Sequence, residues 1–81
     1  MKLTMPAVEP GNRDIRADGV KVGFAIDVWD SQDPYNGAWE ARLYGSVTVP
    51  CEIVAIVNRL RLRDLRAELQ RRLDEDGPWW Q

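Results

Sequence analysis

Residues 18–30 read DGVKVGFAIDVWD and carry the clearest structural signal in the chain. The stretch begins with Asp18 and Gly19, a pair that favours the two-residue turn of a β-hairpin because both residues tolerate positive φ. The residues after the turn alternate between apolar side chains and others, and the apolar set is Val20, Val22, Phe24, Ile26 and Val28. Because successive side chains of a strand point to opposite faces, this period of two predicts one buried face. We therefore expect a hairpin with strands over residues 13–17 and 20–30.

A third strand is predicted over residues 39–49. Its apolar side is formed by Trp39, Ala41, Leu43, Gly45, Val47 and Val49. These residues alternate with polar or charged ones, which again indicates a strand with one buried face. A register that pairs Ile26 with Leu43 also sets Asp27 opposite Arg42, and opposite charges facing each other across two strands are favourable.

The second half of the chain has helical periodicity. Pro50 suits the first position of a helix, and Glu52 then lies near the positive end of the helix dipole. Two apolar sets recur at helical spacing: Ile53, Ile56, Val57 and Leu60, followed by Leu62, Leu65, Leu69 and Leu73. At ~100° per residue, the second set lies ~160° around the axis from the first. The helix is therefore expected either to break near residues 58–61 or to continue with its second set facing away from the sheet.

Together these elements predict an α+β fold and a single domain over residues 1–81. An antiparallel sheet of three strands is followed by one long or broken C-terminal helix that ends at Gly77-Pro78, in the order β-β-β-α(-α). Residues 2–8 give a fourth strand as the alternative, and Pro6 restricts them to an edge because proline has no N–H to donate. The expected core draws on both halves of the chain: Phe24, Ile26, Leu43, Ile56 and Leu60.

Composition and charge exclude several classes of protein. The 81 residues carry a formal net charge of -2, whereas nucleic-acid-binding proteins usually carry a positive excess. With one cysteine and no histidine, the chain cannot form an internal disulfide, and most catalytic triads and zinc sites are excluded. Because no apolar run is long enough to cross a bilayer and the start lacks the apolar core of a signal peptide, we expect a cytoplasmic protein without membrane contact.

Two features invite a chemical interpretation. Cys51 lies at a predicted helix N-terminus, where the dipole favours a reactive thiolate, but without a histidine base the favoured interpretation is a small packing residue. Asp27, Asp30 and Asp33 could bind a hard cation, yet their spacing is not that of an EF-hand loop, so we interpret them as acids of a solvated turn. We therefore expect a protein that is not an enzyme and that has no metal or cofactor.

Arginine residues of the C-terminal half give one candidate binding surface. Arg59, Arg63 and Arg66 recur at helical spacing, and such a stripe can contact the phosphates of a nucleic acid. The alternative is a solvated helix face with local ion pairs such as Glu68 with Arg72. Because the total charge is negative, a small nucleic-acid-binding regulator is the second hypothesis rather than the first.

The leading hypothesis is a small protein-interaction module of the inhibitor or adaptor type. On a continuous helix, the leucines at positions 62, 65, 69 and 73 would form an exposed apolar stripe that marks an interface, and two copies could pair these stripes as a homodimer. Trp79 and Trp80 follow the helix and should dock on their own domain or in a partner's pocket, since tryptophan is frequent at binding hot spots. The predicted protein-binding residues are Leu62, Leu65, Leu69, Leu73, Trp79 and Trp80. A phage or mobile-element accessory protein that acts on a host protein fits this description.

Overall fold

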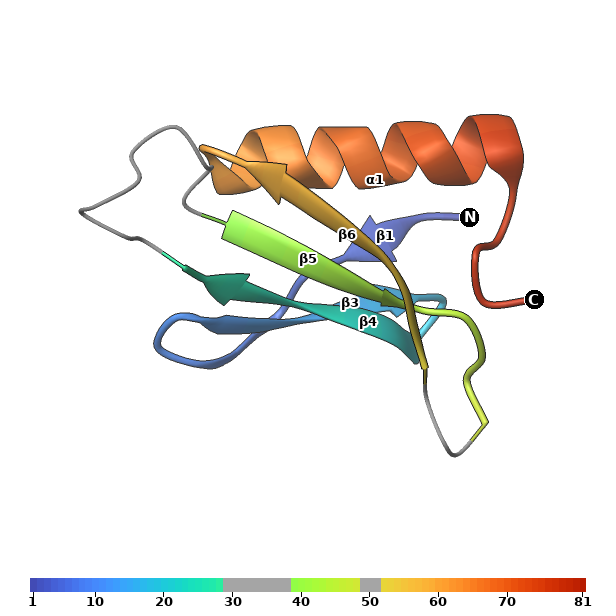
Figure 1. The fold of residues 1–81 in the computed structure, drawn as a ribbon, viewed down its shortest axis with the longest axis horizontal. Helices are drawn as coiled ribbons and strands as arrows, with labels where there is room; N and C mark the ends of the chain where they lie inside the picture. Colours follow the sequence, from blue (N-terminus) through green and yellow to red (C-terminus); the bar gives the residue numbers. More distant parts are fainter. Residues whose placement is uncertain (29–38, 49–51) are drawn as a thin grey trace.

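The computed structural model describes residues 1–28, 39–48 and 52–81. Within these residues the chain forms one antiparallel sheet of six strands and one C-terminal helix (Figure 1). The elements are β1 (Leu3–Thr4), β2 (Ala7–Glu9), β3 (Asn12–Ala17), β4 (Val20–Asp27), β5 (Trp39–Tyr44), β6 (Ile53–Arg59) and α1 (Leu62–Asp76). The predicted α+β fold with an antiparallel sheet is confirmed, whereas the prediction of three or four strands undercounts.

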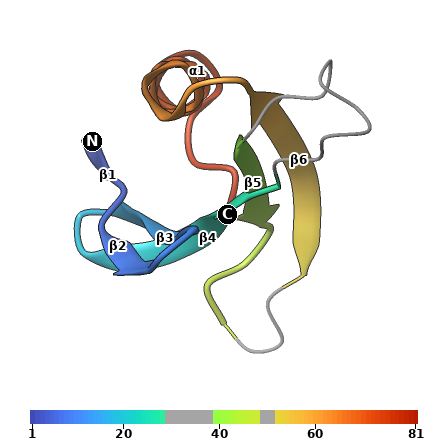
Figure 2. The same ribbon diagram turned by 90° about the vertical axis from the view of Figure 1, so that its left-hand side faces the viewer.

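The sheet curves around the core, and the helix closes its open side. Strands follow the order β1-β3-β4-β5-β6, and β2 pairs with β3 beside β1. Figure 2 shows the sheet bending from β1 and β2 to β6, with α1 between these two ends. The core lies inside this curve, and its buried apolar side chains are Leu3, Met5, Ile15, Ala17, Val22, Ala25, Ala41, Leu43, Val57, Leu65, Leu69 and Leu73.

The hairpin predicted at Asp18 and Gly19 is confirmed. Both residues have positive φ, 51° and 84°, which is the backbone that a type I′ turn requires. They join β3 to β4 with Ala17 opposite Val20.

The face predicted for the later residues of β4 is wrong because of a bulge. Ile15 pairs with Gly23 and Arg16 pairs with Lys21, so Val22 is an extra residue on β4. A bulge of this kind reverses the face of every later side chain in the strand.

The consequence is that Ala25 is fully buried in the core, while Phe24 and Ile26 lie half-buried on the outer face. The register with β5 also differs from the predicted one, since Leu43 lies opposite Gly23 and Ile26 opposite Glu40.

The first half of the predicted helix is a strand. Ile53–Arg59 forms β6, which pairs with β5 so that Ala41 faces Val57 and Leu43 faces Ala55. The physical reason is the density of β-branched residues at positions 53, 54, 56 and 57, because such side chains are stiff in a helix and pack well on a sheet. Ile56 and Leu60, which were expected in the core, are 55% and 57% exposed.

The helix begins only at Leu62, so the two apolar sets belong to two different elements. Leu65, Leu69 and Leu73 are buried against the sheet and Leu62 is half-buried. The helix ends as predicted at Gly77, whose φ of 78° suits a residue without a side chain and whose N–H donates to the carbonyl of Leu73. Of the two alternatives open from the sequence, the continuous helix is not formed. The chain changes direction at residues 60 and 61, but between a strand and a helix rather than between two helices.

We predict that Leu69→Ala and Leu60→Ala will differ strongly in their effect on stability. Leu69 is fully buried and Leu60 is largely exposed, although the chemical change is the same. Urea denaturation should show a loss of about 2–5 kcal/mol for Leu69→Ala and of less than about 1 kcal/mol for Leu60→Ala. Equal losses for the two variants would contradict the position of Leu60 at the surface.

Candidate functional site

The exposed edge of the sheet at β6 is the most distinctive surface of the described residues. β6 is seven residues long, pairs with β5 on one side and is the last strand in the sheet order. Ile53, Val54 and Ile56 are 42%, 57% and 55% exposed, and Leu60 follows directly after the strand. An edge strand presents unpaired backbone N–H and C=O groups, so a long apolar edge is a template for pairing with another strand.

The opposite edge of the sheet is protected against such pairing. β1 and β2 are two and three residues long, and Pro6 and Pro10 flank β2. The pairing of β2 with β3 is also irregular, with a register shift between Ala7 and Glu9. Short strands, prolines and bulges are the usual means by which proteins prevent edge-to-edge association. β6 is longer and contains no proline between Ile53 and Arg59, and its one irregularity is a bulge at Val54, near the start of the strand.

The outer face of the sheet carries a second apolar area. The rings of Phe24 and Tyr44 lie 6.0 Å apart at 54°, and Ile56 lies opposite Arg42 on the neighbouring strand. The cations of this face are each paired with a carboxylate: Arg16 and Lys21 with Asp14, and Arg42 with Glu40. Among the described residues of this face, the aromatic rings therefore have no uncompensated cation beside them, as binding to nucleic-acid phosphates would require.

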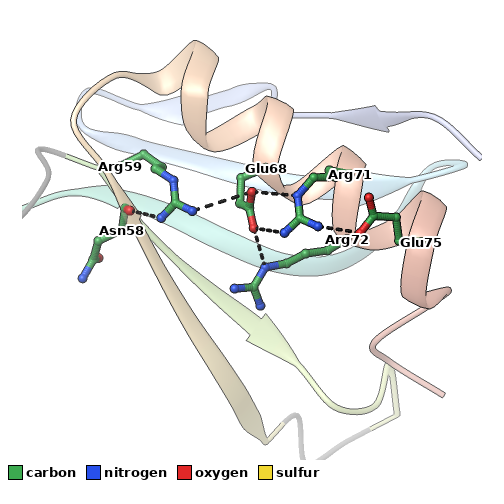
Figure 3. Close-up of polar contacts among 6 residues, drawn as sticks. All are labelled: Asn58, Arg59, Glu68, Arg71, Arg72 and Glu75. Carbon is green, nitrogen blue, oxygen red and sulfur yellow. Dashed lines mark hydrogen bonds and ion pairs between the residues drawn. The ribbon is translucent and has the colours of Figure 1, made fainter.

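Glu68 of α1 links the helix to the end of β6 (Figure 3). Its carboxylate accepts hydrogen bonds from Arg71 at 2.6 and 3.1 Å and from Arg72 at 3.1 Å. The guanidinium of Arg59, at the end of β6, lies 3.6 Å from the same carboxylate. The hydrogen bonds from Arg71 and then Arg72 lower the pKa of Glu68 to about 2. Glu68 thus neutralises positive charge next to the exposed strand.

The predicted leucine surface is not available on the folded chain. Leu65, Leu69 and Leu73 lie in the core against the chain's own sheet, and Leu62 packs beside them. The exposed stripe on which the predicted dimer depended would exist only on a continuous helix, and that helix is not formed.

The two C-terminal tryptophans contact their own domain. Trp79 donates its indole N–H to the carbonyl of Val22 at 3.0 Å, and the rings of Trp79 and Trp80 meet edge to face at 5.1 Å. Both pack against the core as half-buried residues, at the end of the tail that descends from α1 in Figure 1. Their docking in cis was one of the two alternatives open from the sequence.

The predicted arginine stripe is not formed either. Arg59 lies on a strand and faces Glu68, whereas Arg63 and Arg66 lie on the other flank of α1. There they line a cavity together with Arg13 of β3. The sequence analysis did not identify Arg13. It is about 50 residues from Arg63 and Arg66 along the chain, so no local pattern indicates that the three side chains line the same cavity.

Most of the residues considered for catalysis or cation binding lie outside the described part of the chain. Cys51, Asp30 and Asp33 belong to the parts of the chain that are not described, and Asp27 is an exposed residue at the end of β4. Within residues 1–28, 39–48 and 52–81, no group of three potential metal-binding side chains is present. No described helix is long and apolar enough to cross a membrane.

Comparison with known proteins gives no relative for this chain. No protein-family model, no curated protein and no solved structure matches it. The function must therefore be argued from the geometry of its surfaces.

We predict that Glu68→Gln will lower the melting temperature at neutral pH and that this difference will shrink in acid. The pKa of Glu68 is lowered from 4.5 to about 2 by folding, so its carboxylate stabilises the fold fully above pH 4.5. This contribution is lost as the pH falls from about 4.5 to about 2, where the folded protein also binds the proton. Melting curves of the parent and the variant between neutral pH and pH about 2 measure the effect.

Glu75→Gln is the matched control for this prediction. The Glu75 carboxylate contacts Arg71 alone among the described residues and its side chain is 59% exposed, so its removal should change the melting temperature less. A Glu68→Gln deficit that stays constant across the whole pH range would contradict the assigned role of Glu68.

We predict that Trp79→Phe will destabilise the domain by about 1 kcal/mol or more, because the Val22 carbonyl loses its hydrogen-bond donor. Gln81→Ala, at an exposed neighbouring position, should leave the stability unchanged. Chemical denaturation of the two variants checks this, and a Trp79→Phe variant as stable as the parent would show that the indole contact contributes nothing.

Proposed function

We propose that this chain is a non-enzymatic protein-interaction module that associates through β6, and that the strand which pairs with β6 is the same strand of a second copy. The observation that carries the proposal is the contrast between the two edges of the sheet. The edge at β1 and β2 is shortened, irregular and flanked by prolines, while β6 is long, apolar and exposed. Natural sheets rarely leave such an edge open without a partner.

A second copy fits β6 because the strand can pair antiparallel with itself about a two-fold axis. In a pair centred on Ile56, the two Ile56 side chains lie next to each other, and Arg59 of one copy lies opposite Ile53 of the other. The two Arg59 side chains are then at opposite ends of the interface. Because the two Arg59 side chains are far apart in this pair and each lies 3.6 Å from the Glu68 carboxylate of its own chain, repulsion between them is weak.

This arrangement keeps the homodimer that the sequence suggested but moves its interface from the leucines of the helix to β6. The leucines of α1 stabilise the domain from inside, and the dimer joins two six-stranded sheets into one continuous sheet. The proposed role as an inhibitor or adaptor, in the cytoplasm and with a phage or mobile-element accessory protein as one setting, then rests on a dimer rather than on a free helix face.

The proposal is tested by the oligomeric state of the parent and of Ile56→Glu. Light scattering over a wide concentration series should show a dimer for the parent and a folded monomer for Ile56→Glu. The new carboxylates would repel each other across the two-fold axis, while within one chain each faces Arg42 and is tolerated. Circular dichroism and thermal melting report whether the variant is folded.

Val8→Glu is the matched control, since Val8 is 62% exposed on β2 at the protected edge. It should leave the dimer intact. A parent that is monomeric throughout the series would contradict the proposal that a second copy pairs with β6. A dimer that survives Ile56→Glu but not Val8→Glu would place the interface at the edge formed by β1 and β2, which also contradicts it.

A further inference from the structure

A cavity of about 460 Å³ lies between the N-terminal segment, β3 and the first half of α1. Its apolar lining consists of Met5, Leu62 and Ala67, and Gln70 also lines it. Gln70 also holds the N-terminal segment in place, because it accepts a hydrogen bond from the N–H of Leu3 at 3.1 Å and donates one to the carbonyl of Met1 at 2.9 Å. The cavity is therefore formed by segments that are tied to each other, and its volume is in the range of small-molecule sites.

Three arginines converge on this cavity: Arg13, Arg63 and Arg66. Arg13 donates from Nη1 to the carbonyl of Met5 at 2.9 Å, and its guanidinium lies 5.9 Å from the centre of the Trp39 ring. Arg66 donates from Nη2 to the carbonyl of Leu3 at 3.5 Å. Since a guanidinium has five N–H donors, each of these two retains donors for a ligand. The short bond to Met5 orients Arg13, whereas the contact of Arg66 with Leu3 is long.

The arginines of this cavity differ from most of those elsewhere on the described surface, which form ion pairs with carboxylates. Among the described residues, no carboxylate lines it, and Arg13 and Arg66 have no acidic partner. Arg63 lies 3.7 Å from Asp64, and both side chains are largely exposed, so this pair is weak. The positive end of the dipole of α1 adds to the same potential, because Leu62 is the first residue of the helix.

We propose that this cavity binds a small carboxylic acid with an apolar body. The carboxylate would be held between Arg13 and Arg66, whose planar donor groups match a carboxylate in two-point hydrogen bonding. The apolar body lies against Met5, Leu62 and Ala67. An anion without an apolar body leaves this floor uncovered, and an apolar molecule without charge leaves the guanidinium donors unused. The site is separate from the β6 edge and does not depend on dimer formation.

The experiment is a titration of the full chain with sodium octanoate, followed by the amide signals of Met5 and Ala67 in ¹H–¹⁵N NMR spectra. Acetate supplies the charge without the apolar body, octanol supplies the body without the charge, and inorganic phosphate supplies a different anion. Octanoate should shift both signals in a saturable manner and bind about ten-fold or more tightly than each of the three other compounds. Equal binding of octanol, acetate or phosphate would overturn the proposed ligand class.

Three variants decide whether the arginines carry the binding. Arg66→Gln should weaken octanoate binding about ten-fold, and Ala67→Glu should weaken it at least as much by placing a carboxylate at the cavity. Arg61→Gln removes the same charge just before the helix but outside the cavity lining, and should bind octanoate like the parent. Unchanged binding in a folded Arg66→Gln and a folded Ala67→Glu overturns the site. The Ile56→Glu variant should retain octanoate binding. The test of the cavity is therefore independent of whether the chain forms a dimer through β6.

Discussion

The packing of Leu65, Leu69 and Leu73 onto the curved sheet is the interaction on which the rest of the structure depends. In a chain of 81 residues the sheet alone could not bury its inner face, because Leu43 and Val57 would face water without the helix. The two ends of the sheet are also held by the helix. Gln70 binds residues 1–3 and Glu68 contacts Arg59 at the end of β6, so α1 is connected to both ends of the curved sheet that Figure 2 shows.

Because the apolar side of α1 packs within the domain, the exposed apolar surface available to the proposed partner lies on the sheet. The same packing holds β6 in place. Val57 is buried in the core, while Ile53, Val54 and Ile56 remain exposed. A strand held in this way has already lost its conformational entropy, and pairing with a second strand then costs less than it would for an unfolded segment.

Local sequence patterns predicted the hairpin turn and the end of the helix correctly. They failed for features that depend on contacts between residues far apart in the sequence. The turn at Asp18-Gly19 and the helix end at Gly77 were predictable because each depends on positive φ at one or two residues. The bulge at Val22 was not, because pairing with β3 creates it, and it reversed the face of Phe24 and Ile26. Residues 53–60 fit helical spacing by coincidence of apolar positions, and the two signals against a helix were their β-branched residues and the ~160° offset from the later leucines. The candidate surfaces were harder still, since an edge exists only once the strand order is known and the arginine cavity unites β3 with α1.

The two flanks of α1 show how the partner of an arginine decides what its charge can do. On the flank facing β6, Arg59, Arg71 and Arg72 share the carboxylate of Glu68, so part of their charge is offset within the domain. On the other flank, Arg13 and Arg66 are oriented by backbone carbonyls, which accept hydrogen bonds but carry no net charge. The first arrangement suits the approach of an uncharged apolar strand, and the second leaves a positive potential above an apolar floor. Neither proposal therefore rests on the number of arginines on the helix, and both rest on which oxygen atoms the guanidinium groups contact.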